Sequence, residues 1–322
     1  MPVTITAGIT FSGGGLTMAF APPSTATAGW WAGGSPNTST VQRITFATDT
    51  VTASGRGPLS DPFRSQGSTG TFTYGWYACG YAPGGVQITT VNRITFASDT
   101  NTASVRGPLN RLVYNLAATT TDTYGWFGGG YNASDSPVSS VSRITYATDT
   151  STATGVGPLS TEQAGLAATG TDTYGWFAGG RGPAGRKSSV SRITYVSDTN
   201  TASVRGPLSV NILVLAAVTD STTYGWFGGG YAPPNNPTSG VDRITYATDT
   251  ATASVRGPLT LARQLLSAAC DSTNGWFGGG LGPGGSSSTV DRITYATDTN
   301  TASVRGTLIQ AIYQTSSTSG IQ

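Results

Sequence analysis

The chain has 322 residues, of which 10% are charged, and its 17 Lys and Arg against 15 Asp and Glu give a net charge of +2. This balance supplies no basic surface for nucleic acid and no long-range attraction to a membrane. No stretch is long and apolar enough for a transmembrane helix, and the N-terminus lacks the basic and apolar regions of a signal peptide. We therefore expect neither nucleic acid nor a membrane among its partners.

One segment recurs along almost the whole chain. Residues 122–159 (DTYGWFGGGYNASDSPVSSVSRITYATDTSTATGVGPL) return with little change, and a Gly-Trp step marks each copy. A period of roughly 50 residues with four short apolar runs per copy is typical of a repeat architecture. Abundant Thr, Val, Ile and aromatic residues favour an all-β fold. The tryptophans of the six copies are Trp30, Trp76, Trp126, Trp176, Trp226 and Trp276.

Each copy divides into four expected strands. In the third copy the first strand lies near the Leu-Ala-Ala step at 116–118, and the others span 124–130, 141–148 and 152–159. Adjacent Trp and Phe residues in the second strand must point to opposite faces of the sheet. A sheet with a large aromatic residue on both faces suits a propeller blade packed between two neighbours. Because Gly has no side chain and allows backbones to approach closely, the Gly-Gly step after Trp-Phe indicates a place where neighbouring segments lie close together.

The chain ends indicate how the ring closes. Residues 1–15 look like a shortened third and fourth strand, and residues 309–322 match the spacing of a first strand running toward a second. We therefore predict a seventh, composite blade in which 3–11 lies beside 311–316. The alternative is a six-bladed ring with free terminal arms. One domain would span 1–322, with copies at about 16–59, 60–109, 110–159, 160–208, 209–259 and 260–308.

An Arg in the third strand of each copy is followed six residues later by an Asp in the next turn. A charge on a strand packed on both faces must be paired. We expect structural Arg-Asp pairs within or between blades; the alternative is a ring of Arg that binds an anion. The arginines are Arg43, Arg93, Arg143, Arg192, Arg243 and Arg292. The aspartates are Asp49, Asp99, Asp149, Asp198, Asp249 and Asp298.

The residues that usually carry catalysis are scarce. The chain has no His, one Glu (Glu162) and one Lys (Lys187), so a His-based triad or metal site is impossible. Most Asp residues lie in turns, where Asp caps its own backbone. Cys79 and Cys270 occupy non-equivalent positions in distant copies, which favours two free thiols over a disulfide. We expect neither enzymatic activity nor a cofactor.

The aromatic strand closed by a double Gly, followed by a strand with a Tyr such as Tyr146 before a polar turn, resembles the kelch repeat. The resemblance covers residues 16–308 and implies a β-propeller. It departs in the fourth strand, where kelch repeats usually carry Trp and this chain has TASVRGPL. The copper oxidases with kelch propellers need His ligands, so their activity does not carry over. The near-identical VDRITYATDT and TASVRGPL phrases also look like repeats of bacteriophage tail and virion proteins.

The copies agree in two turns and differ in the loop between the second and third strands. Loops that vary on a constant scaffold are where binding specificity usually lies. The residues in these loops that could bind are Tyr81, Tyr131, Arg181, Arg186, Lys187 and Tyr231.

These features favour a non-catalytic virion or tail component, made in the host cytoplasm without a signal peptide. Its partners would be other virion proteins, a host receptor or a glycan. A lectin-like propeller and a kelch-type scaffold for protein interactions are the alternatives.

Overall fold

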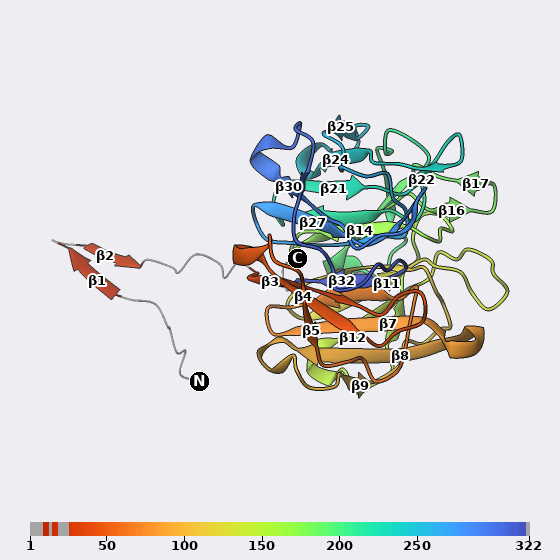
Figure 1. The fold of residues 1–322 in the computed structure, drawn as a ribbon, viewed down its shortest axis with the longest axis horizontal. Helices are drawn as coiled ribbons and strands as arrows, with labels where there is room; N and C mark the ends of the chain where they lie inside the picture. The colour runs from red at the N-terminus through yellow and green to blue at the C-terminus, as the bar shows by residue number, and fades with distance from the viewer. Residues whose placement is uncertain (1–8, 13–14, 19–25, 320–322) are drawn as a thin grey trace.

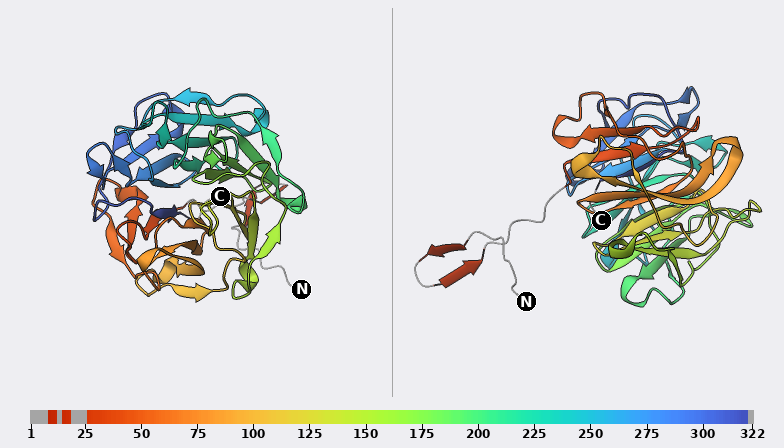
Figure 2. Two further views of the ribbon diagram at one scale, coloured as in Figure 1. Left: turned by 90° about the vertical axis from the view of Figure 1, so that its right-hand side faces the viewer. Right: turned by 90° about the horizontal axis from the view of Figure 1, so that it is seen from below.

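The computed structural model describes residues 9–12, 15–18 and 26–319. Six four-stranded antiparallel sheets are arranged as blades around a central axis (Figures 1 and 2). The chain is thus an all-β propeller, as its repeat pattern predicts. Helical structure in these ranges is confined to single turns of 3₁₀ helix.

Each blade runs from an inner strand at the axis to an outer strand at the rim. Blade I contains β32 (Ser316–Thr318), β3 (Ala28–Ala32), β4 (Val41–Thr45) and β5 (Ser54–Arg56). Blade II contains β6 (Gly67–Gly70), β7 (Tyr74–Ala82), β8 (Val86–Thr95) and β9 (Ser104–Arg106). Blade III contains β10 (Ala117–Thr120), β11 (Tyr124–Gly128), β12 (Val141–Thr145) and β13 (Thr154–Val156). Blade IV contains β14 (Ala167–Gly170), β15 (Tyr174–Ala178), β18 (Val190–Thr194) and β19 (Ser203–Arg205). Blade V contains β20 (Ala216–Thr219), β21 (Tyr224–Gly228), β24 (Val241–Thr245) and β25 (Ser254–Arg256). Blade VI contains β26 (Ser267–Cys270), β27 (Asn274–Gly278), β30 (Val290–Thr294) and β31 (Ser303–Val304).

Short elements decorate the two ends of the blades. The 3₁₀ turns are η1 (Phe46–Thr48), η2 (Pro83–Gly85), η3 (Phe96–Ser98), η4 (Tyr146–Thr148), η5 (Tyr195–Ser197), η6 (Tyr246–Thr248) and η7 (Tyr295–Thr297). Two-residue strands pair as β16 (Arg181–Gly182) with β17 (Gly185–Arg186), β22 (Tyr231–Ala232) with β23 (Asn236–Pro237), and β28 (Leu281–Gly282) with β29 (Gly285–Ser286).

The prediction of a seventh blade is wrong. The first copy supplies only three strands to its blade, and β32 from the far end of the chain takes the vacant inner position by pairing with β3. Of the predicted partner segment, 3–11, residues 3–8 lie outside the described residues. Residues 9–11 belong to β1 (Ile9–Ser12), which pairs with β2 (Gly15–Met18). The ring therefore has six blades, and the C-terminal segment closes it rather than forming a free arm.

Strands end earlier than the sequence pattern indicates. In the third copy the second strand stops at Gly128, because Gly129 and Gly130 adopt φ of +69° and +100° and leave the ladder. The third strand stops at Thr145, where the chain turns into η4. The predicted strand 152–159 shortens to β13. Each shift lies at a turn, where backbone geometry rather than apolar periodicity sets the end.

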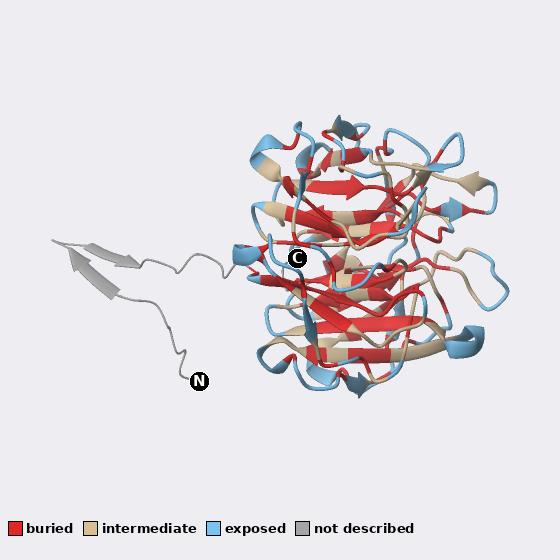
Figure 3. Ribbon diagram, viewed as in Figure 1, coloured by how far each residue is buried: buried red, intermediate tan, exposed pale blue. Residues whose placement is uncertain are grey.

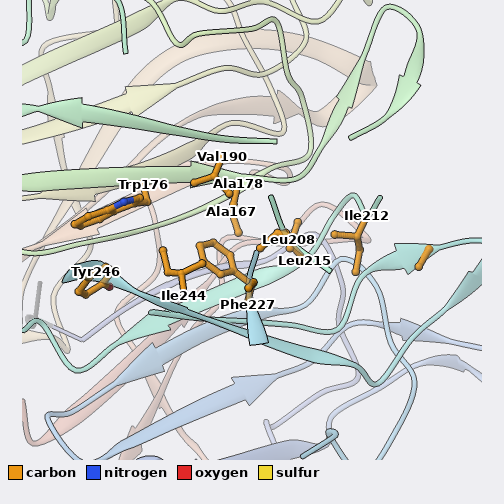
Figure 4. Packing of buried hydrophobic residues seen from close by; sticks show 12 residues of the cluster. Ala167, Trp176, Ala178, Val190, Leu208, Ile212, Leu215, Phe227, Ile244 and Tyr246 are labelled. Carbon is orange, nitrogen blue, oxygen red and sulfur yellow. The ribbon is translucent and has the colours of Figure 1, made fainter. Parts of the chain in front are cut away.

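The hydrophobic core lies between blades, as expected for sheets with an aromatic residue on each face. Buried residues run along the strands, and exposed ones gather in the turns and at the rim (Figure 3). Between blades IV and V, Trp176 packs beside Tyr246 while Phe227 and Ile244 fill the adjoining layer (Figure 4). Every one of the six joints is built from such a cluster of two neighbouring blades, so no blade buries its faces alone.

A buried polar network joins each blade to the next. In the joint of blades V and VI, the Trp226 ring stacks on Tyr295 at a centroid distance of 4.0 Å, and its Nε1 donates to Asp298 Oδ2 at 2.8 Å. Arg243 and Arg256 contact the same carboxylate oxygen at 2.9 and 3.4 Å. Every Arg-Asp pair in this series connects two blades. A single carboxylate oxygen thus accepts a hydrogen bond from an indole and lies beside two cations taken partly out of water.

The joint of blades III and IV has one cation fewer. Val156 occupies the place that Arg256 has in blade V, so the Asp198 carboxylate receives only Trp126 at 2.7 Å and Arg143 at 2.9 Å. Blade I closes the series, because Asp49 accepts Trp276 from blade VI at 2.8 Å. The network therefore runs around the entire ring.

Candidate functional site

The loops that differ between copies gather on one end of the propeller, which we call the variable-loop face. It comprises the loops after the second and fourth strands of each copy, and it lies at the right of Figure 1, where β16, β17 and β22 are labelled. The opposite end, the turn face, carries η1 and η3 to η7 and the turns between the first and second strands. In the left view of Figure 2 the variable-loop face points at the reader.

Backbone hydrogen bonds connect the two kinds of variable loop in each blade. Tyr131 N donates to Tyr114 O at 2.8 Å, and Tyr114 N donates back to Tyr131 O at 3.1 Å. The Gly-Gly step allows this approach, because a Cβ on Gly130 would lie 2.8 Å from Tyr114 O. The side chains of these loops thus differ between blades, whereas the backbone bridge that holds the loops is the same. The six bridges are Ser35–Tyr313, Arg64–Tyr81, Tyr114–Tyr131, Ala164–Arg181, Leu213–Tyr231 and Gln264–Leu281.

Three tyrosines from blades II and III form a cluster on this face. The Tyr114 ring lies between Tyr81 and Tyr131, with centroid distances of 4.5 and 5.1 Å. Arg64 lies 5.4 Å over the Tyr81 ring, and Tyr114 donates to Asp135 Oδ1 at 2.8 Å. Partial burial raises the pKa of Tyr114 and of Tyr131, so both hydroxyls stay protonated at neutral pH. The cluster offers half-buried aromatic rings together with a cation and a carboxylate.

The structure brings two of the sequence candidates, Tyr81 and Tyr131, into this tyrosine cluster, but their link was missed. The linking residue, Tyr114, lies in the loop before the inner strand β10 and was not among the sequence candidates. A usable signal exists, because the equivalent positions hold Arg64, Ala164, Leu213 and Gln264, and Tyr recurs there only as Tyr313 of the C-terminal segment.

The remaining candidates form a cationic sector on blade IV. Arg181 is exposed, whereas Arg186 lies 4.9 Å over the Tyr231 ring of blade V and hydrogen bonds with Asn235. Lys187 packs against Gly182, where an added Cβ would collide with the Lys187 side chain. Four of the six sequence candidates therefore lie together, and Arg186 connects the loops of blades IV and V.

A ring of backbone hydrogen bonds surrounds the axis on this face. One residue per blade adopts φ between +51° and +64° and donates its N–H to the carbonyl of its counterpart in the preceding blade, at 2.6 to 2.9 Å. The last step, from Ser65 N to Gln314 O, links the second copy to the C-terminal segment. The six residues are Ser65, Asn115, Gly165, Val214, Leu265 and Gln314.

This ring frames the mouth of the central channel. Gln314, Ser65 and Asn115 line one side of the opening, and Val214 and Leu265 line the other. The cavity measures about 140 Å³, below the several hundred Å³ usual for small-molecule sites. The outer loops therefore present the larger contact surface.

A buried ion pair lies beneath the loops of blade VI. Arg263 donates to Asp291 Oδ2 at 2.5 Å and to Thr289 O at 2.8 Å, with both charged side chains at 1% exposure or less. Burial lowers the pKa of the Arg263 guanidinium, and the adjacent carboxylate opposes that shift. Gln163 and Ser191 hold these two places in blade IV. The pair is a polar core element of one blade.

The other sequence expectations concern chemistry elsewhere in the chain. Cys79 and Cys270 are buried free thiols, as predicted. Among the described residues, no group of three or more His, Cys, Asp or Glu side chains is arranged to hold a metal ion. Within the same ranges, no helix is long and apolar enough to cross a membrane.

The chain matches no protein-family model and no curated protein. The structure defines its class as a β-propeller built from repeated four-stranded blades. The resemblance to kelch repeats and to phage tail repeats rests on the repeat motifs alone.

Proposed function

We propose that this propeller is a non-catalytic binding module of a bacteriophage virion or tail, whose variable-loop face contacts a partner or receptor. The main observation behind the proposal is that the differences between copies are confined to one face of the propeller. The joints repeat the same Trp, Arg and Asp contacts from blade to blade, whereas the loops on one face differ in sequence between copies. A rigid frame with a diverse surface suits recognition, because little ordering entropy is lost on binding.

The phage assignment draws on two further points. The near-identical copies resemble phage tail and virion repeats, and a Lys-poor, Thr- and Gly-rich composition suits a particle that must persist outside the cell. The closed ring supports this role, because it leaves no blade with an unpaired inner face.

The cationic sector provides the test. Replacing Arg181, Arg186 and Lys187 together with Ser should change adsorption of the particle or binding of the partner, while the melting temperature stays nearly constant. Arg111→Ser, which removes an exposed cation elsewhere on the same face, is the matched control. Unchanged binding after exchange of all the loops that follow the second strands would rule out the proposed face.

Glycan binding is the second candidate, favoured by the tyrosine cluster. Tyr81, Tyr114 and Tyr131 offer half-buried rings beside Arg64 and Asp135, a combination that can pack on sugar C–H groups and bond their hydroxyls. Glycan-array binding that disappears in a Tyr114→Ala variant would support this reading. Loss of binding to a purified virion protein instead would assign the cluster to protein recognition.

A further inference from the structure

Most of the positive charge of this chain is used to hold the fold together. Among the described residues, twelve of the 17 Lys and Arg side chains form ion pairs with aspartates, in the joints and beneath the loops of blade VI, and five do not. All five belong to the variable-loop face. The positive charge that the fold leaves free is therefore concentrated on one face. The five are Arg64, Arg111, Arg181, Arg186 and Lys187.

Four of these cations lie beside the tyrosines of the same face. The tyrosine cluster begins with a cation, because Arg64 lies 5.4 Å over the Tyr81 ring. From Tyr81 the rings of the cluster follow one another at centroid distances of 4.5 and 5.1 Å and end at Tyr131. The cationic sector ends with a ring, because Arg186 lies 4.9 Å over Tyr231. Cations and phenol rings thus follow one another from blade II to blade V.

A backbone ladder joins the tyrosine cluster to the cationic sector. Tyr131 pairs with the residue that precedes Val138, and Val138 itself pairs with Gln163 of blade IV. The residue after Gln163 pairs with Arg181. Burial raises the pKa of Tyr131 and the charge of Arg181 opposes that shift, which agrees with two side chains on one surface. The tyrosine cluster, the cationic sector, Arg64 and Tyr231 therefore form one surface, which we call the tyrosine–arginine strip.

Carboxylates interrupt the strip without cancelling its charge. Tyr114 donates to Asp135, and Asp61 and Glu162 are exposed in neighbouring loops. The positive charge is thus in excess but is not continuous. A nucleic acid binds best along an unbroken basic path that follows its phosphates. The interrupted charge favours a ligand whose acidic groups are spaced between neutral ones.

The side chains of the strip are held in place before a ligand arrives. A guanidinium stacked on a phenol ring keeps its N–H groups in its own plane, where they can bind a carboxylate through two hydrogen bonds. The hydroxyls of Tyr114 and Tyr131 stay protonated at neutral pH, because burial raises the pKa of both, and can exchange hydrogen bonds with sugar hydroxyls. Interfaces between proteins centre on apolar side chains, whereas this strip combines cations, hydroxyls and phenol rings. This combination matches a chain of sugars that carry carboxylates.

We propose that the variable-loop face binds an acidic polysaccharide along the tyrosine–arginine strip. The sugar rings pack beside the tyrosines, and the carboxylates bond to Arg64 at one end and to Arg181 and Arg186 at the other. This ligand presupposes the binding role proposed above for the face and narrows it to one chemical class. The backbone ladder lets a sugar chain contact several blades with little ordering of the protein.

An array of acidic sugars tests the ligand class. The probes are hexasaccharides of alginate, hyaluronan and polygalacturonate, each beside its carboxyl-reduced form, titrated into the full chain by calorimetry. We expect at least one acidic probe to bind about tenfold more tightly than its reduced form, because reduction removes the bonds between cation and carboxylate. Added salt should weaken binding of the acidic probe alone, since it screens charges at the surface. If no acidic probe binds more tightly than its reduced form, the proposal fails.

Variants at the two ends test whether the strip acts as one site. Arg64→Gln and Arg186→Gln should each weaken binding of the preferred acidic probe by about tenfold, since each removes a charged donor. Arg111→Gln removes an exposed cation outside the strip and should leave the affinity unchanged. The melting temperature should stay nearly constant in all three variants, because these positions are at the surface. A loss of affinity confined to one end, or an equal loss in Arg111→Gln, would overturn the continuous strip.

Other outcomes separate this ligand from the binding role of the face. Preferential binding of neutral glycans that is lost when the loops are exchanged would retain the binding face and overturn its acidic ligand. An acidic probe that binds equally well after exchange of all the loops would overturn both. Equal binding of a hexa-aspartate peptide or of oligothymidylate would show that charge alone is recognised, which also overturns the polysaccharide.

Discussion

Truncation of a joint tryptophan probes the packing between blades. Trp226 is completely buried between blades V and VI, where it stacks on Tyr295 and donates to Asp298. A buried indole removes roughly 200 Å² of surface from water, which at about 25 cal/mol per Å² is worth about 5 kcal/mol. Because the joint can relax partly around the void, we expect Trp226→Ala to lower the free energy of unfolding by about 3–5 kcal/mol.

Conservative substitutions separate the ring from its N–H group. Trp226→Phe keeps an aromatic ring in the joint but removes the donor to Asp298, whose carboxylate retains Arg243 and Arg256. Trp126→Phe leaves Asp198 with one cation, because Val156 stands in the second place. A partly satisfied buried carboxylate is costly, so Trp126→Phe should destabilise the protein by about 1 kcal/mol more than Trp226→Phe.

Urea denaturation at neutral pH, followed by far-ultraviolet circular dichroism, measures all three variants. A single transition with an unchanged slope is required for the comparison. A loss below about 1 kcal/mol for Trp226→Ala would refute the reasoning, since that value is typical of exposed positions.

Three further predictions follow from the ring, the ion pair and the thiols. Deleting 310–322 removes the inner strand of blade I, so the melting temperature should fall and the chain should associate through the exposed edge; a monomer of wild-type stability would contradict this. Arg263→Ala leaves the buried Asp291 carboxylate without its partner and should lower the free energy of unfolding by about 3–5 kcal/mol. Replacing Arg263 and Asp291 together with the Gln and Ser of blade IV should leave that free energy nearly unchanged. Equal losses for the two variants in urea titrations would show that the unpaired charge is not the cause. Burial raises the pKa of Cys270 from 9.0 to about 11, so the contribution of the neutral thiol to stability is complete below pH 9 and is lost as the pH rises through 11. The stability of Cys270→Ser should therefore fall less steeply with rising pH than that of the wild type. An identical dependence of stability on pH would exclude the thiol as a cause.

Local patterning was sufficient to predict the blade. Adjacent Trp126 and Phe127 have to face opposite ways in a strand, and both are buried against different neighbours. The Gly-Gly step after them adopts positive φ, as its composition suggested. These features repeat at short range, so one copy contains nearly all the information needed.

Long-range closure was predictable only in part. The sequence indicated that the C-terminal segment is a first strand that closes the ring, but not its partner: Ser316, Ser317 and Thr318 pair with Trp30 to Ala32 at the other end of the chain. What selects them is the vacant inner edge of blade I, a property of the assembled ring.

Amide exchange at the C-terminal segment tests the six-bladed ring most directly. The Gln314 N–H donates to Leu265 O at 2.9 Å, as the Asn115 N–H does to Ser65 O at 2.9 Å within the continuous part of the ring. If the C-terminal segment closes the propeller, the Gln314 amide should be protected to within about tenfold of the Asn115 amide under native conditions. Exchange of the Gln314 amide at the rate of an unstructured peptide, with Asn115 protected, would contradict closure by this segment.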